Sequence, residues 1–187
     1  MYQYARSSNQ SSFRSTNPLS NEQIARYAPS VLAQEAHESR GERYTFIPTI
    51  EVLDGLRREG FQPFEVRQTR VRDQSKREHT KHLVRLRHES SITSVEEVPE
   101  IILLNSHDGS SSYQLLSGFF RFVCSNGLIA GDVCNDIRVR HSGNVVDDVI
   151  EGAVRVLDNV EQIAGRIDTY KSITLAPQEA VDRKSVV

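Results

Sequence analysis

The sequence predicts an α+β domain, in which a mostly antiparallel, curved sheet carries helices packed on one face and a long C-terminal helix. Three observations support this fold class. Segments 64–72 and 82–88 alternate apolar and polar residues around a polar link, a pattern typical of a β-hairpin. Segments 101–107 and 113–116 repeat the pattern. Residues 145–170 place their apolar side chains on one helical stripe. Because few of the links between strands could hold a helical crossover, we expect neighbouring strands to pair in antiparallel fashion.

Length and local composition divide the chain into three parts. At 187 residues, it suits one domain of ordinary size with one core. Residues 1–20 are rich in Ser, Asn and Gln and show no periodicity, so we expect a flexible N-terminal arm. The single α+β domain should span residues 21–172, and residues 173–187 should form a frayed C-terminal tail.

Two helical segments precede the first hairpin. Apolar residues within 21–36 recur at helical spacings but are interrupted at Pro29, which predicts a short helix, a turn and a further turn of helix. Residues 50–59 predict a second helix, with Thr49 as its N-cap and Gly60 as its left-handed stop.

Three shorter segments complete the predicted domain. Residues 43–48 alternate enough for a short strand, and residues 136–141 form another. Residues 117–125 fit one face of a helix, although their Phe and Val content also suits a strand. We favour the helix, ended by Asn126-Gly127.

The total charge indicates no particular class of partner, because the formal net charge is only -2. The longest apolar run, residues 101–104, is far shorter than the roughly 20 residues that span a bilayer. The N-terminal residues also lack the apolar stretch of a signal peptide. From these patterns we expect a cytoplasmic protein with no membrane segment.

Positive charge is concentrated in the first predicted hairpin. Between residues 67 and 88, six Arg and two Lys stand against two acidic residues. Pairing of the strands would assemble the cations into a plate suited to phosphate backbones, which bind through counterion release without a sequence code. The alternative is a solvated hairpin neutralised within the fold by Glu96, Glu97 and Glu100. We call the eight cations the basic hairpin: Arg67, Arg70, Arg72, Lys76, Arg77, Lys81, Arg85 and Arg87.

A group of polar residues, the polar knot, lies at the end of the third predicted strand: Asn105, Ser106, His107 and Asp108, with Asn126 after the next apolar block. Successive side chains on a strand point to opposite faces, so Ser106, His107 and Asp108 cannot align as a hydrolase triad. We expect Asn105, Ser106 and Asp108 instead to satisfy backbone groups at the strand end and turn. Catalysis by Asn105, His107, Asp108 and Asn126 is the least favoured interpretation, and we expect no enzyme.

Two other kinds of site find little support in the sequence. Residues 109–112 resemble a phosphate-binding nest but lack the lysine of a P-loop, so a flexible hairpin tip is favoured. The six histidines show no spacing typical of a metal site. A metal would require His107 and Asp108 to join histidines from neighbouring strands, namely His82, His88 or His141. We therefore expect neither a metal nor an organic cofactor.

Several blocks of the sequence resemble the YfjQ/YafZ family. They are HESRGERYTFIPTIEVLDGLRREGFQPF, RVRDQSKREHTKHLVRLR, EVPEIILLNSHDGSSSYQLLSGFFRFVCSNGLI and VIEGA. The most specific parts are NSHDGSSSYQ and FRFVCSNGL, and the resemblance covers residues 19–175. It implies a domain of unknown function carried by bacterial prophages, genomic islands and plasmids. Because family members usually extend further, the resemblance also implies a short or C-terminally truncated version.

The resemblance implies a role useful to a mobile element, such as recombination, replication, plasmid maintenance or defeat of host defence. The order of elements also resembles, at low resolution, the core of Rad52-like single-strand annealing proteins, which is an analogy of fold alone. Together with the basic hairpin, this favours a non-enzymatic protein that binds single- or double-stranded DNA and forms a homo-oligomer. Bases would stack on Tyr2, Tyr4, Tyr113 or Phe119. The alternative is an anti-defence or regulatory module that binds a host protein.

Overall fold

The computed structural model describes residues 10–93, 98–122 and 129–142, together with positions 152, 155 and 158. Six strands form one antiparallel sheet, in which the order in space equals the order in sequence. The strands are β1 (Gln10–Arg14), β2 (Phe61–Thr69), β3 (His82–His88), β4 (Pro99–Asn105), β5 (Tyr113–Phe122) and β6 (Ile129–Val139). The helices are α1 (Asn21–Tyr27) and α2 (Thr49–Arg58), with short 3₁₀ helices η1 (Pro29–Leu32), η2 (Gln74–Lys76) and η3 (Glu89–Ser91).

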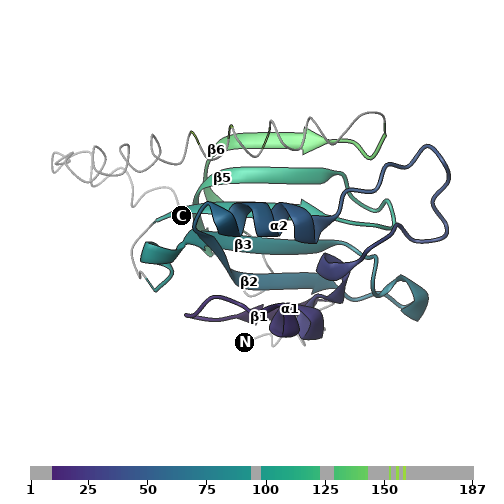
Figure 1. Ribbon diagram of the computed structural model, residues 1–187, viewed down its shortest axis with the longest axis horizontal. Coiled ribbons are helices and arrows are strands. Elements are labelled where there is room, and N and C mark those ends of the chain that lie inside the picture. Colours follow the sequence, from purple (N-terminus) through teal and green to yellow (C-terminus); the bar gives the residue numbers. More distant parts are fainter. Residues whose placement is uncertain are drawn as a thin grey trace, which may run out of the picture.

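Both α-helices lie on the same face of the sheet, and the hydrophobic core fills the space between (Figure 1). On this core face, Val84 of β3 lies opposite Val66 of β2 and Leu103 of β4. Leu103 pairs in turn with Leu115 of β5, and Leu53 of α2 belongs to the same buried cluster. Each such side chain contributes roughly 1.5–3 kcal/mol when it leaves water. The predicted α+β class, with its antiparallel sheet, is confirmed.

The predicted turns and hairpins are also confirmed. β2 and β3 form the first hairpin, with Gln68 opposite His82. Gly60 (φ 84°) follows α2 and Gly109 (φ 73°) lies in the β4–β5 turn, both in the left-handed region that glycine adopts without strain. The predicted N-cap is wrong, because Pro48 precedes α2 and Thr49 is its first residue. The Thr49 hydroxyl instead bonds with the side chains of Asn105 and His82.

Three other segments differ from the prediction. Residues 10–14, which we assigned to a flexible arm, form β1, because Phe13 pairs opposite Val66 and stacks on Tyr27 with ring centroids 4.4 Å apart. Residues 43–48 form no strand. Residues 117–122 continue β5 instead of forming a helix, because they pair with β4 on one side and β6 on the other. Hydrogen bonding on both edges outweighs the local helical pattern.

The predicted long C-terminal helix lies mostly outside the described residues. Positions 152, 155 and 158 are helical, and Gly152 is buried. A Cβ added at Gly152 would lie 2.9 Å from the Ile137 side chain, so this position packs closely on β6. Residues 1–9 and the predicted tail 173–187 also lie outside the described part. Within that part, no helix is both long enough and apolar enough to cross a membrane.

Candidate functional site

Several loops meet at one end of the sheet, which we call the loop end. The register places the end of β2, the start of β3 and the end of β4 side by side, since Gln68 lies opposite His82 and His82 opposite Asn105. The β2–β3 connection (residues 70–81) and the β4–β5 turn (residues 106–112) therefore leave the sheet at the same end (Figure 1). The chain also passes this end between η1 and α2. Most of the residues predicted to carry function are located here.

The basic hairpin is divided by the structure into a buried part and an exposed part. Arg67, Arg85 and Arg87 are buried on the sheet face opposite the core, where they alternate with two equally buried acids, Glu65 and Glu100. Arg85 donates to Glu65 (Nη1 to Oε2, 3.0 Å) and to Glu100 (Nε to Oε2, 2.9 Å). Arg67 pairs with Glu65 at 2.5 Å and Arg87 with Glu100 at 2.7 Å. We call these five residues the buried charge chain.

For Arg67, Arg85 and Arg87, the structure favours neutralisation within the fold over an open basic plate. Arg85 is only 1% exposed and Arg87 is 8% exposed, and both guanidinium groups lie over the Phe64 ring, 5.3 and 4.6 Å from its centroid. Their charges are neutralised by Glu100, one of the three acids that the sequence suggests for this role. The other two, Glu96 and Glu97, lie outside the described residues. A flat, open plate of eight cations is therefore not formed. The strand pattern could not reveal this for Arg85 and Arg87, because their acidic partners lie on neighbouring strands.

The other five cations make up the exposed part, which we call the basic tip: Arg70, Arg72, Lys76, Arg77 and Lys81. All five lie in the β2–β3 connection or directly beside β3, and all but Lys76 are exposed. Two acids, Asp73 and Glu78, lie in the same segment. Within the described residues, none of the five side chains forms a salt bridge. The five cations outnumber these two acids, so the basic tip presents an excess of positive charge to solvent.

Three residues of the polar knot, Asn105, Ser106 and Asp108, hydrogen-bond with backbone groups at the strand end and turn, as predicted. Asn105 and Ser106 are fully buried, and the Ser106 hydroxyl bonds with the backbone N–H and carbonyl of Ser111 across the turn (2.9 and 3.1 Å). Asp108 accepts from the N–H and hydroxyl of Ser110. Tyr44 donates its hydroxyl to the Ser106 carbonyl at 2.8 Å. These bonds fix the β4–β5 turn, while Asn126 lies outside the described residues.

A buried hydrogen-bond network connects α2 with β3 and β4. Asn105 donates to the Thr49 hydroxyl at 3.0 Å, and this hydroxyl lies 2.8 Å from His82 Nε2. His82 Nδ1 faces the Thr80 carbonyl at 3.1 Å, so Nδ1 carries the ring proton and Nε2 accepts from Thr49. His107 Nε2 lies 3.4 Å from the same hydroxyl. The Thr49 hydroxyl bonds within this network and therefore does not cap the N-terminus of α2.

The histidines of this network are held neutral. Burial lowers the pKa of His82 to about 4 and that of His107 to about 3, and the nearby rings of His82, His141 and His79 lower the pKa of His107 further. The pKa of His141 is also lowered by burial. His107 Nδ1 is buried and has no hydrogen-bond partner in the described part of the chain. The hydrogen bond to the Thr80 carbonyl and the charge of Asp108 raise the pKa of His82 but do not offset its burial.

The arrangement gives no catalytic or metal geometry among the described residues. The Ser106 hydroxyl bonds with the turn backbone, and His107 is 0% exposed, so the two do not form a nucleophile and base open to substrate. In the described ranges, no three His, Cys, Asp or Glu side chains are placed to hold a metal ion. The buried histidines His82 and His107 therefore have a structural role in the hydrogen-bond network.

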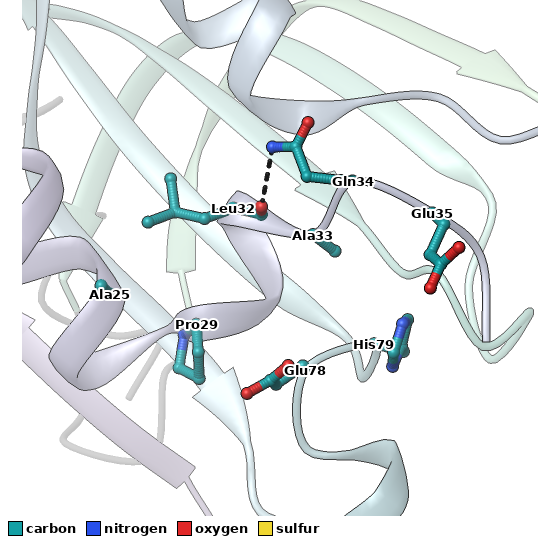
Figure 2. Close-up of a pocket in the computed structure, with 8 residues that line it drawn as sticks. All are labelled: Ala25, Pro29, Leu32, Ala33, Gln34, Glu35, Glu78 and His79. Carbon is teal, nitrogen blue, oxygen red and sulfur yellow. Dashed lines mark hydrogen bonds between the residues drawn. The ribbon is translucent and has the colours of Figure 1, made fainter.

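A pocket that the sequence did not indicate lies between η1 and the basic tip. It has a volume of about 400 Å³, and its walls include Pro29, Leu32, Ala33, Glu35, Glu78 and His79. Figure 2 shows that Glu78 and His79, which lie in the β2–β3 connection, face Pro29 and Ala33. The Glu35 carboxylate is directed towards His79. The pocket therefore combines an apolar wall with carboxylates. No sequence signal could find it, because its walls come from segments more than 40 residues apart.

Gln68 holds the two walls of this pocket together. Its side-chain oxygen accepts from the N–H and the hydroxyl of Ser30 in η1 (3.0 and 2.7 Å). Its side-chain nitrogen donates to the Arg77 carbonyl in the tip at 2.8 Å. A second tie joins the tip to the β4–β5 turn, because the His107 N–H donates to the His79 carbonyl at 2.7 Å. The position of the basic tip is thus fixed at two points.

We expect Gln68→Leu to lower the free energy of unfolding by about 2 kcal/mol, because buried Ser30 donors and the Arg77 carbonyl lose their partner. Urea unfolding measures the change. Gln62→Leu on the same strand is the matched control, since Gln62 is only half-buried and has no side-chain hydrogen bond in the described part of the chain. Equal losses in the two variants would contradict the role assigned to Gln68.

Comparison with known proteins gives a family but no chemistry. Two relatives, UPF0380 protein YfjQ and UPF0380 protein YafZ, both of Escherichia coli (strain K12), are each 56% identical to this chain over 164 residues. The alignments cover 88% of this chain but 60% of each relative, so the chain spans well under two thirds of their length. No solved structure matches it significantly. Residues 36–183 match a family described as "Domain of unknown function (DUF932)", and the chain belongs to that family.

Proposed function

We propose that this protein binds nucleic acid without catalysing a reaction, and that the basic tip holds the phosphate backbone. One observation carries the proposal: five cations project from one connection, and the described residues offer them no salt bridge. Arginine and lysine in such a cluster bind phosphates by releasing condensed counterions. The tip is also held in place by Gln68 and by the His79 carbonyl. An ordered connection loses less conformational entropy on binding than a free loop does.

The proposed phosphate-binding surface contains fewer residues than the eight cations that the sequence predicts for it. Arg67, Arg85 and Arg87 belong to the buried charge chain and are not part of the proposed surface. Tyr113 is fully buried, so it does not stack on bases. Burial also raises the pKa of its hydroxyl. A role in recombination or replication of a mobile element, with single-strand binding or annealing, remains the setting that the family resemblance implies for such a protein.

Replacing Arg72 and Arg77 by Gln should weaken DNA binding by roughly 10- to 100-fold near 0.1 M salt, because two phosphate contacts are lost. The slope of log affinity against log salt should fall by about 2 for duplex DNA and somewhat less for single strands. Fluorescence anisotropy with labelled DNA over a salt series measures both quantities.

The control is Arg58→Glu, which changes the net charge by the same amount at an exposed position on the last turn of α2, at the other end of the sheet. It should leave the salt slope unchanged. If the control and the tip variant weaken binding equally, the tip is not the site. If the protein binds no DNA at low salt, the proposed function fails. Nuclease-insensitive capture of one stoichiometric host protein would then support the alternative class.

A further inference from the structure

We propose that the pocket between η1 and the basic tip receives an unpaired nucleobase that carries an exocyclic amino group, as cytosine, adenine and guanine do. This inference rests on the proposed function, because the same strand would have its phosphates on the basic tip. It adds a preference for single strands and for particular bases, which the tip alone cannot give, since phosphate contacts carry no sequence information.

The size and walls of the pocket suit a base. Its volume of about 400 Å³ lies within the range of roughly 300–1,000 Å³ typical of small-ligand sites. Pro29, Leu32 and Ala33 supply an apolar wall against which a flat ring can pack. The Gln34 amide donates to the Leu32 carbonyl at 3.1 Å, so it is engaged within the wall (Figure 2).

The charges of the pocket select the part of the nucleotide that enters. The exposed carboxylates of Glu35 and Glu78 repel phosphate and accept hydrogen bonds from amino groups. Cytosine, adenine and guanine present such a group on their pairing edge, whereas thymine presents a single ring N–H between two carbonyl oxygens that a carboxylate repels. A pairing edge is free only when the base is unpaired. The carboxylates therefore favour amino bases of a single strand.

The position of the pocket links it to the phosphate site. Glu78 directly follows Arg77 in the chain, so one connection presents a cation to the backbone and a carboxylate to the base. Gln68 bonds to Ser30 in one wall and to Arg77 in the other, which holds the pocket open before any ligand arrives. A cationic side chain from a partner protein would also suit the carboxylates, but the five cations of the basic tip repel a positively charged partner.

The test compares oligodeoxycytidylate, oligodeoxyadenylate and oligothymidylate of equal length by fluorescence anisotropy. We expect the unmodified protein to bind the first two roughly tenfold more tightly than oligothymidylate, the discrimination that a well-placed hydrogen-bond pair gives. The double variant Glu35→Gln, Glu78→Gln should abolish this preference while oligothymidylate affinity holds or rises, because negative charge is removed. Ala33→Phe, which fills the pocket, should abolish the preference as well.

Two controls separate the failure of this inference from that of the proposed function. Glu59→Gln removes an exposed carboxylate at the far end of α2 and should keep the base preference. Arg72→Gln with Arg77→Gln should weaken all three oligonucleotides by the same factor and keep their ratio. Equal binding of the three by the unmodified protein would overturn the pocket assignment but leave the tip proposal standing. Absence of binding to all three and to duplex DNA at low salt would overturn both. A preference that survives Ala33→Phe in a folded protein would place base recognition elsewhere.

Discussion

Acidification from pH 7 to pH 5 is expected to lower the free energy of unfolding by about 3–4 kcal/mol, because two imidazoles are neutral in the folded state and charged in the unfolded one. The pKa of His82 is about 4 and that of His107 about 3 in the fold, against roughly 6.5 in an unfolded chain. Between these values the unfolded state binds more protons. Stability is therefore fully present above pH 6.5 and falls by about 1.4 kcal/mol per pH unit for each imidazole below it.

Urea unfolding at a series of pH values measures this dependence. His107→Gln should lower the slope between pH 6 and pH 5 by roughly a third to a half, because one buried imidazole is removed while those of His82 and His141 remain. The matched control is His88→Gln, which should leave the slope unchanged. His88 is exposed and lies at the opposite end of β3 from His82. A stability that stays constant from pH 7 to pH 5 in the unmodified protein would contradict the assignment of neutral, buried imidazoles.

The second large effect is expected from the buried charge chain. Glu100→Gln should lower the free energy of unfolding by about 3–5 kcal/mol, the usual result of removing one partner from a buried ion pair. Glu100 is 1% exposed and bonds with both Arg85 and Arg87. After the change, Glu65 is the one carboxylate that the described residues place against the buried arginines. Urea unfolding at neutral pH measures the loss.

The control for this variant is Asp136→Asn, which breaks the ion pair between Asp136 and Arg138. That pair lies at the surface, where solvent screens the charges, so no measurable change in stability is expected. The comparison isolates burial, because both substitutions replace a carboxylate by its amide in an ion pair of the same sheet. If Glu100→Gln proves as mild as Asp136→Asn, the buried charge chain does not stabilise the fold.

The parts of the fold that were predicted correctly are those fixed by neighbours in sequence. The β2–β3 hairpin follows from alternation on each strand, and α2 with Gly60 follows from helical spacing and a left-handed stop. Residues 117–122 were assigned wrongly because their state is set by the strands on either side, which a local pattern does not contain. β1 was missed for the same reason.

The candidate site was predictable only in part. The concentration of cations was visible in the sequence, and so was the role of Asn105 and Ser106 at the strand end. Which cations are neutralised depends on Glu65 and Glu100, which meet Arg85 only after three strands pair. The histidine network also depends on the fold, because Thr49 and His107 lie 58 positions apart.

The order of the strands has a consequence for how the chain reaches its fold. Because each strand pairs with the strands next to it in sequence, most backbone ladders close short loops, and short loops lose little chain entropy on closure. The exception is β1, which is separated from β2 in sequence by α1, η1 and α2, so that its pairing closes a longer loop. Topologies dominated by such local contacts fold faster than those that join distant segments. The meander from β2 to β6 can therefore assemble one hairpin at a time, without waiting for distant segments of the chain to meet.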